Sequence, residues 1–182
     1  MKIRCLLLMS MSVLAGCVSM SETECRNANA ATWESIGQED GQDGQTPERR
    51  LAQHREACAK VGVTPDRDRY LQGWSRGIVD YCTPERAYAV GLDGSSGNDA
   101  MCPGDSSRLF RLNAQLGRQV HDLKDDISRL QDEIRGMEKK LENPQLDRDA
   151  RADLRAKIRH RDEELSRLRP LLVEMQMRPL VR

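Results

Sequence analysis

The chain has 182 residues, a formal net charge of zero, 38% hydrophobic and 32% charged residues, and a single phenylalanine. A balanced charge gives no reason to expect binding to nucleic acid or to an acidic lipid surface. Because apolar residues are few, the chain cannot bury one large globular core, and we expect a small cross-linked domain beside long solvated helices. A largely disordered chain is the alternative, but the regular apolar spacing in the C-terminal half argues against it.

Residues 1–16 have the layout of a secretory signal peptide. Lys2 and Arg4 form a basic start, and the apolar run that follows is too short to span a bilayer as a mature helix. The segment ends in Leu14-Ala15-Gly16-Cys17, which resembles the lipobox of bacterial lipoproteins. The resemblance implies cleavage before Cys17, diacylation of its thiol (as with palmitate) and acylation of the new amino group.

The residues after Cys17 bear on location. In lipoproteins of enteric-type bacteria, Asp after the modified cysteine resembles an inner-membrane retention signal, whereas Val18 and Ser19 follow here and resemble default export. We therefore expect a lipid-anchored cell-envelope protein in the outer membrane that faces the periplasm, with residues 17–23 as its tether. Apart from the covalent lipid on Cys17, no cofactor and no metal are expected.

Residues 24–105 form the next expected unit, a Gly-rich region that contains every Trp and Tyr of the chain. The region contains four cysteines. An even number of cysteines in an exported region is typical of disulfide bonds formed in an oxidising compartment, so we expect two such bonds. A zinc site is the alternative, but the spacing includes no C-x-x-C and no nearby pair of histidines. Four cysteines permit three pairings, and their spacing does not choose among them. The four are Cys25, Cys58, Cys82 and Cys102.

A loose repeat of an aromatic residue followed by two glycines at helical spacing begins at Trp33, Tyr70 and Tyr88. On a helix such residues share one face. Glycine costs a helix about 1 kcal/mol relative to alanine, so the repeat indicates close approach of another backbone or of an aromatic ring. We expect packing within a helical domain, and the alternative is a ligand-binding groove. The residues of that candidate groove are Trp33, Asp40, Tyr70, Trp74 and Tyr88.

After the break at Pro103-Gly104, we expect a long helix over 106–142, in which the run 107–142 is about 54 Å long. Its apolar residues alternate spacings of four and three, which is the seam of a coiled coil. Asn113 fills the one polar position, where an Asn weakens a seam but fixes its register. The seam residues are Leu109, Leu116, Val120, Leu123, Ile127, Leu130, Ile134, Met137 and Leu141.

Asn143-Pro144 stops that helix, and a second charged helix is expected over 147–169, ended by Pro170. A short break between two heptad segments favours an antiparallel coiled-coil hairpin. The second helix covers only part of the first, so the stretch 109–123 needs either the disulfide-bonded domain or a second chain. The tail 170–182 has no clear apolar period and either covers that stretch or stays mobile. The predicted fold class is mainly α: a small disulfide-stapled, Gly-rich helical domain followed by this hairpin.

The N-terminal half also resembles a known family over about residues 17–110. Members of the family catalogued as domain of unknown function 2799 (DUF2799) are small bacterial envelope lipoproteins without an established activity. The resemblance implies the disulfides and the anchor but no mechanism. The residues that carry it are Cys25, Trp33-x3-Gly37-x2-Asp40-Gly41-x2-Gly44, His54-x3-Cys58, Tyr70-x2-Gly73-x3-Gly77, Tyr81-Cys82-Thr83-Pro84, Ala87-Tyr88-x2-Gly91-x2-Gly94 and Cys102-Pro103.

Hairpin geometry favours one disulfide pairing. Helices over 24–43 and 47–60 would form an antiparallel hairpin that brings Cys25 beside Cys58, and Cys82 and Cys102 would then pair across a Gly-rich loop. Each bridge contributes about 2–4 kcal/mol, which so small a core requires.

Catalytic motifs do not occur in the sequence: it has no nucleophile elbow, no H-E-x-x-H, no P-loop and no C-x-x-C. His121 and His160 lie among charged residues, and His54 lies one helical turn before Cys58. Asp40 and Asp43 lie beside glycines, where they could bind a cation or act as acid or base, but turns and caps are the ordinary interpretation of such carboxylates. We therefore expect a protein that is not an enzyme.

Two functions fit these observations. The first is a non-enzymatic cell-envelope lipoprotein, a structural or protein-interaction module whose coiled coil engages an unknown envelope protein or a second copy. The alternative is a ligand-binding lipoprotein that holds a cell-wall glycan or a peptide in the aromatic groove. Neither involves nucleic acid, and the membrane is contacted through the lipid anchor.

Overall fold

The structure is a computed structural model that describes residues 20–182. The predicted signal peptide and the lipid attachment site at Cys17 lie outside the described residues. The described chain forms seven α-helices and one short 3-10 helix, so the mainly α fold class is confirmed. In order, the helices are α1 (Glu22–Asn27), α2 (Ala30–Gln42), α3 (Pro47–Ala59), α4 (Arg67–Tyr81), α5 (Pro84–Leu92), η1 (Asp99–Met101), α6 (Asp105–Leu141) and α7 (Arg148–Gln176).

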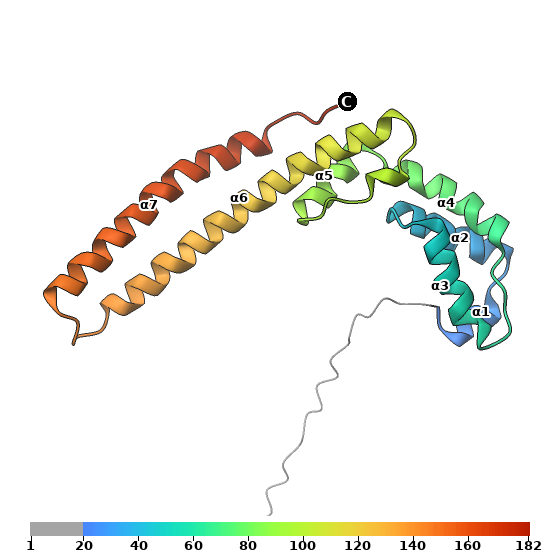
Figure 1. Cartoon of the computed structure of the whole chain (residues 1–182), viewed down its shortest axis with the longest axis horizontal. Helices are drawn as coiled ribbons and strands as arrows, with labels where there is room; N and C mark the ends of the chain where they lie inside the picture. Colours follow the sequence, from blue (N-terminus) through green and yellow to red (C-terminus); the bar gives the residue numbers. More distant parts are fainter. Residues whose placement is uncertain (1–19) are drawn as a thin grey trace, which may run out of the picture.

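The molecule is elongated and bent (Figure 1). Helices α1 to α4 gather at one end, α5 lies against the beginning of α6, and α6 and α7 run side by side as a long arm. Within residues 20–182, no helix combines the length and the apolar character that a membrane crossing requires.

The single helix expected over 24–43 is in fact two, because a local cap begins a new helix at Ala30. The Asn29 side chain accepts a hydrogen bond from the Thr32 N–H at 3.0 Å, and Thr32 Oγ1 accepts one from the Asn29 N–H at 3.3 Å. This reciprocal pair satisfies N–H groups that a helix start leaves free, which favours a break before Asn29 over a continuous helix.

α2 packs chiefly on α4 and only slightly on α3. The prediction that α2 and α3 form an antiparallel hairpin is therefore wrong. Gly37 and Gly41 contact the α4 backbone, and Gly73 and Gly77 contact the α2 backbone. A Cβ on Gly73 would lie 1.8 Å from the carbonyl oxygen of Glu34. Only glycine permits this approach, and the backbone contact inferred from the glycine repeat is observed. The contacts advance together along both helices, which therefore run in the same direction.

Two disulfide bonds join Cys25 to Cys58 and Cys82 to Cys102, the pairs favoured from the sequence. The first links α1 to α3, which do contact each other. The predicted Cys25–Cys58 bond is therefore present, although α2 packs chiefly against α4 and only slightly against α3. Cys25 and Cys58 are buried with Trp33 in a small apolar cluster.

A second glycine contact joins α5 to α6. A Cβ on Gly91 would lie 2.1 Å from the carbonyl oxygen of Ala114, and one on Gly117 would lie 2.2 Å from that of Tyr88. The part of the 109–123 stretch that the hairpin leaves uncovered is thus packed against the disulfide-bonded region.

A hydrophobic core crosses the domain boundary predicted at residue 105. Phe110 and Ala114 of α6 are buried together with Ile78, Tyr81 and Ala87. The Tyr81 and Phe110 rings stack with their centroids 4.7 Å apart. The first turns of α6 therefore belong to the N-terminal unit, which we define as residues 20–120.

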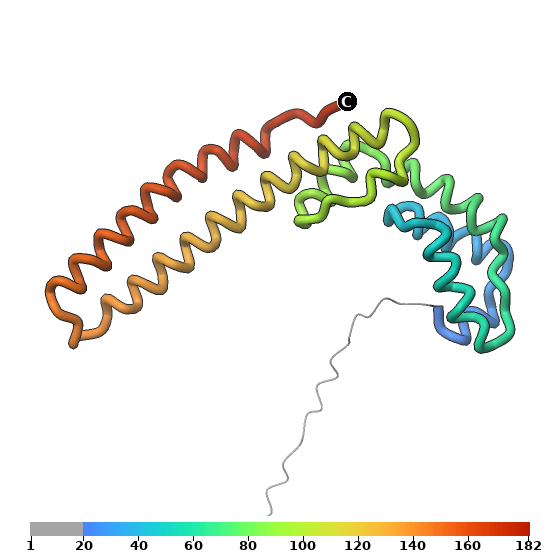
Figure 2. The backbone as a smooth tube through the Cα atoms, in the orientation of Figure 1, coloured from blue at the N-terminus to red at the C-terminus, as the bar shows by residue number. Residues whose placement is uncertain are grey.

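The C-terminal tail binds the buried side chain of Asn113, which is 0% exposed. Its Nδ2 donates to the carbonyl oxygens of Leu109 (2.8 Å) and Val181 (2.9 Å), and its Oδ1 accepts from the Val181 N–H at 2.9 Å. Figure 2 shows the chain end returning beside the first half of α6. Asn113 therefore binds the tail. Of the two alternatives for the tail, the structure shows the one in which it covers part of the stretch 109–123.

α7 continues through Pro170 to Gln176, so the helix end predicted at 169 and the tail predicted from 170 are wrong. A proline removes one helix hydrogen bond, yet apolar packing on both sides can hold the helix together. Leu165 and Met175, which flank Pro170, are 3% and 6% exposed.

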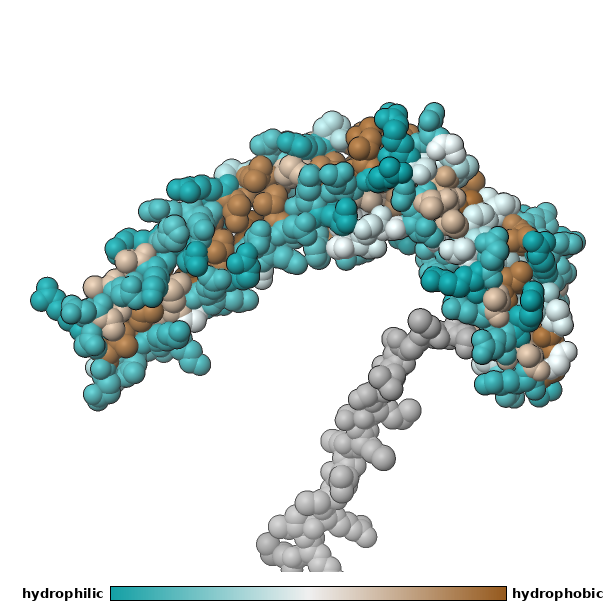
Figure 3. Space-filling view, in the orientation of Figure 1, coloured by the Kyte–Doolittle hydropathy of each residue, from teal (hydrophilic) through white to brown (hydrophobic). Residues whose placement is uncertain are grey.

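α6 and α7 form a helical hairpin in which Leu130, Ile134 and Leu165 are buried. We call residues 121–176 the arm. Figure 3 shows apolar side chains gathered along the line between the two helices, with hydrophilic side chains on either side. The predicted hairpin is present, whereas coiled-coil packing of its helices stays a prediction.

Arg151 closes the turn at the tip of the arm. Its guanidinium donates to the carbonyl oxygens of Leu141 at 2.8 Å, Asn143 at 2.6 Å and Leu146 at 3.1 Å. These acceptors include a carbonyl at the end of α6 that lacks a partner within the helix, so one side chain both caps α6 and holds the start of α7.

Candidate functional sites

The structure does not gather the five candidate groove residues into one open groove. Trp33 and Tyr70 are 2% and 0% exposed, and Asp40 is 6% exposed. Trp74 is partly buried, and its indole N–H donates to the Gln45 carbonyl at 2.8 Å.

Tyr88 lies elsewhere, on α5, with its carbonyl oxygen against Gly117 of α6. The aromatic groove is therefore wrong as a single site. Trp33, Tyr70 and Trp74 pack within the fold, beside the glycines that bring α2 and α4 into contact.

Asp40 is the centre of a buried polar network that joins three helices. Its Oδ2 accepts hydrogen bonds from the Tyr70 hydroxyl and from His54 Nε2, each at 2.9 Å, and its Oδ1 accepts one from Arg50 Nε at 2.9 Å. Burial raises the pKa of Asp40, but the hydrogen bonds from His54, Tyr70 and Arg50 outweigh it and hold that pKa below its usual value. Burial and the Asp40 charge raise the pKa of Tyr70, which stays a neutral donor.

His54 lies between two aromatic rings, edge-on to Trp33 at 6.2 Å and to Tyr70 at 5.9 Å between centroids. Since an ionised Asp40 only accepts, the proton lies on His54 Nε2. His54 Nδ1 is buried and finds no hydrogen-bond partner in the described part of the chain. A hollow of about 260 Å³ opens beside this network. It is lined by Met20, Glu24, Thr32, Ile36, Glu39, Asp40, Arg50 and His54.

An Asp–His pair occurs in several kinds of catalytic site, where the free ring nitrogen must reach a reacting group. In this chain His54 Nδ1 is enclosed, and the pair instead ties α2, α3 and α4 together. Among residues 20–182, no three His, Cys, Asp or Glu side chains gather as metal ligands.

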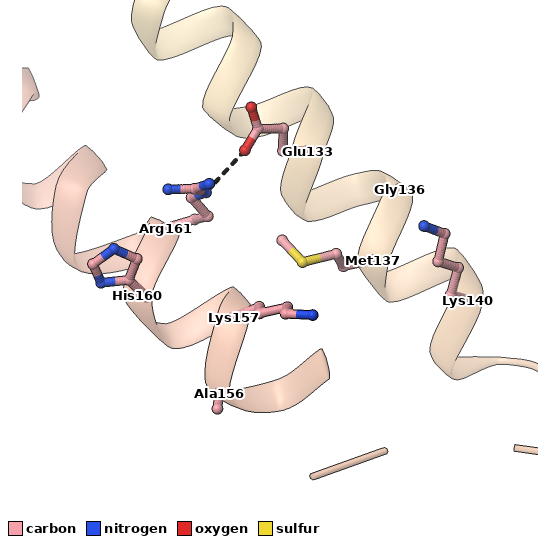
Figure 4. A pocket seen from close by; sticks show the side chains of 8 residues that line it. All are labelled: Glu133, Gly136, Met137, Lys140, Ala156, Lys157, His160 and Arg161. Carbon is pink, nitrogen blue, oxygen red and sulfur yellow. Dashed lines mark ion pairs between the residues drawn. The ribbon is translucent and has the colours of Figure 1, made fainter. Parts of the chain in front are cut away.

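The arm carries a second candidate site, formed by two hollows on one face. The larger, of about 640 Å³, is shown in Figure 4. It is lined by Glu133, Gly136, Met137, Lys140, Ala156, Lys157, His160 and Arg161. The smaller, of about 250 Å³, is lined by Asp126, Arg129, Leu130, Arg161, Glu164, Arg167 and Leu168. We call the two hollows together the arm furrow.

The two hollows are in line because their α6 residues follow helical spacing from Asp126 through Glu133 to Lys140. This stretch is about 21 Å long at 1.5 Å per residue. Arg161 lines both hollows, and its ion pair with Glu133 at 2.8 Å crosses between the helices (Figure 4).

The carboxylates of the furrow are already paired. Arg161 also binds Glu164 at 2.8 Å, and Arg129 pairs with both Asp126 and Glu133. The hydrogen bond from Arg161 holds the pKa of Glu164 below its usual value.

Two cations of the furrow, by contrast, have no such partner. Within residues 20–182, no carboxylate oxygen lies within 4 Å of Lys140 or Arg167. They come from opposite ends of the furrow, one from each hollow.

The furrow was not predicted from the sequence. The heptad pattern predicts which residues lie between α6 and α7, but not the shape of the surface beside that seam. The available signal was Gly136, a glycine in the middle of a charged helix far from the glycine repeat. His160, which lies among charged residues in the sequence, is exposed and lines the larger hollow.

A model of the family described as "Protein of unknown function (DUF2799)" matches residues 32–119. Residues 32–119 of the chain belong to this family. The resemblance seen in the sequence is thereby confirmed, and the matched segment runs from α2 into the first turns of α6, where the shared core ends. No curated protein and no solved structure matches the chain. The DUF2799 model thus covers most of the N-terminal unit and stops short of the arm.

Proposed function

We propose that this DUF2799 protein is a lipid-anchored protein of the cell envelope that binds a partner protein through its arm. The observation that carries the proposal is the contrast between its two parts. The N-terminal unit uses its aromatic residues and glycines in its own packing, whereas the arm projects from that unit and offers the furrow.

The anchor follows from the resemblance of Leu14-Ala15-Gly16-Cys17 to a lipobox. Since α1 begins at Glu22, few residues separate Cys17 from the first helix, and the N-terminal unit would lie close to the membrane. α6 has 37 residues and is about 55 Å long, so the arm would reach partners beyond the immediate membrane surface.

The test places a photo-crosslinking amino acid at single exposed positions of the full-length chain in cells that produce it naturally. Arg135, Arg155, Ala156 and His160 sample the arm, and Gln53 and Val79 sample the N-terminal unit. We expect adducts with another protein from arm positions. Adducts only from Gln53 and Val79, or from no position, would contradict the proposal.

Anchoring is tested by Cys17→Ala in the same cells. The wild-type chain is expected in the membrane fraction and the variant outside it. Equal recovery of both chains in the membrane fraction would show that the lipobox does not anchor the protein.

A further inference from the structure

We propose that the arm furrow binds an acidic amphipathic helix of the partner, which completes a three-helix bundle with α6 and α7. The inference rests on the proposed function and adds the surface and the chemistry of the partner. Three observations carry it: an open glycine, an apolar floor and unpaired cations.

Gly136 is the first observation. The glycines within α2, α4 and α5, and Gly117 in α6, each meet another helix backbone. A Cβ added to any of them would lie between 1.8 Å (Gly73) and 2.5 Å (Gly41) from a backbone atom of the facing helix. An added Cβ on Gly136, by contrast, meets nothing within 4 Å. Glycine in a helix costs about 1 kcal/mol relative to alanine, and nothing within the described chain offsets that cost here.

Ala156 lies across the same hollow, so small residues open the furrow from both helices. This chain already uses glycines twice to seat one helix against another, α2 with α4 and α5 with α6. The geometry at Gly136 therefore fits a third helix that approaches α6 closely.

The apolar floor is the second observation. Met137 and Leu168, which are partly buried, and Leu130, which is buried at the seam, line the furrow among the charged residues. At about 21 Å, the furrow accommodates about four turns of a helix that presents an apolar stripe. Helices that dock in grooves of this kind contribute apolar residues at three- and four-residue spacing.

The charges are the third observation. Of the charged residues in the furrow, Arg129, Lys140, Lys157, Arg161 and Arg167 are basic and only Asp126, Glu133 and Glu164 are acidic.

Asp126, Glu133 and Glu164 bind Arg129 and Arg161, and Lys157 binds Asp153 outside the furrow at 2.7 Å. Within residues 20–182 this leaves Lys140 and Arg167, at the two ends, without an ion pair, although the Arg167 charge helps to lower the pKa of Glu164. Carboxylates that flank the apolar stripe of a partner helix would pair with both. A second copy that presented the same furrow would bring like charges together, which disfavours self-association at this face.

The experiment compares photo-crosslinking from two pairs of neighbouring positions in the full-length chain. Ala156 and His160 line the furrow, whereas Arg135 and Arg155 are exposed on the arm but do not line it. We expect partner adducts from Ala156 and His160 at least tenfold above those from Arg135 and Arg155. Mass spectrometry should map them to an acidic amphipathic segment.

Two matched variants test the mechanism. Gly136→Trp fills the open furrow, and Arg135→Trp places the same side chain on the neighbouring exposed residue. Adducts should be lost with the first and kept with the second. Lys140→Glu combined with Arg167→Glu should lower the yield tenfold, and Lys139→Glu with Arg155→Glu should leave it unchanged. Replacing the mapped acidic residues of the partner by lysine should restore the yield for the Lys140→Glu, Arg167→Glu chain.

The outcomes separate this inference from the proposed function. Adducts from Arg135 and Arg155 but not from the furrow would leave the arm as the binding part and overturn the furrow. A mapped segment that is basic, not helical, or part of a second copy would also overturn the inference. No adduct from any arm position would contradict both proposals.

Discussion

At the scale of single residues, Asp40 joins three of the N-terminal helices through buried hydrogen bonds. It lies on α2 and accepts hydrogen bonds from α3 and α4. Its partners lie 10, 14 and 30 residues away along the chain, so the sequence could single out Asp40 as polar and near glycines but not its contacts.

Asp40→Asn should destabilise the fold by about 3 kcal/mol at neutral pH, because it removes the charge from a buried hydrogen-bonded network. The pKa of folded Asp40 lies below its ordinary value, so its contribution is present above about pH 4 and is lost as pH falls through the folded pKa. Urea unfolding at pH 7 and pH 3 should therefore give a smaller difference between wild type and variant at pH 3. An equal difference at both pH values would contradict the ionised network.

Asn113 and the tail should be energetically coupled. Removing residues 178–182 leaves a buried amide without its two Val181 partners, and Asn113→Ala removes the same bonds from the other side. Each change should cost about 1–3 kcal/mol, and the double variant should cost less than the sum. Additive effects in urea unfolding would indicate that the tail is held by other contacts.

Asn113 and the cysteines differ in how far local sequence determines their partners. Asn113 was identified as the polar position of a heptad, and its burial agrees with that position. Its partner, however, is a backbone segment 68 residues away, and no local pattern carries that information. The two cysteine pairs were predicted correctly because four cysteines permit only three pairings and because the expected helix ends place Cys25 near Cys58.

At the scale of elements, glycine marks where helices meet. The repeat around Gly37, Gly73 and Gly91 predicted close backbone approach, and the approach is observed at each. Which helix approaches which was not predictable, because the spacing of glycines on one helix does not identify its partner.

A pair of matched substitutions separates packed glycine from open glycine. Gly73→Ala should destabilise the fold by more than 2 kcal/mol, since its Cβ would lie 1.8 Å from a carbonyl oxygen. Gly136→Ala should stabilise it by up to about 1 kcal/mol, since the position is helical and open. Thermal unfolding of both variants checks the signs, and destabilisation by Gly136→Ala would show that its surroundings within the chain are not open.

Pro170 shows that a helix-breaking residue does not always mark the end of a helix. The proline predicted a helix end, yet α7 extends through it to Gln176. The apolar residues on its far side were seen as a tail without period. Met175 is buried, and this burial, rather than local propensity, decides the length of the helix.

At the scale of the whole molecule, α6 connects the two parts. It begins in the core that contains Phe110 and ends at the tip of the arm. Heptad spacing predicted the arm, but the domain boundary at 105 was misplaced because Phe110 and Ala114 lie off the seam. A continuous helix of 37 residues allows little independent movement between the arm and the N-terminal unit.

The central claim is that the arm, and not the N-terminal unit, binds the partner. Its most direct test is a chain shortened by two heptads on each helix, without residues 127–140 and 155–168, which keeps the seam in register and removes most of the furrow.

The measurement is the amount of partner recovered by chemical crosslinking of intact cells, with the N-terminal disulfides and the membrane fraction as controls for folding and anchoring. The proposed function predicts that the shortened chain keeps both disulfides and its membrane association but loses the partner. Recovery of the partner at the wild-type level would contradict it.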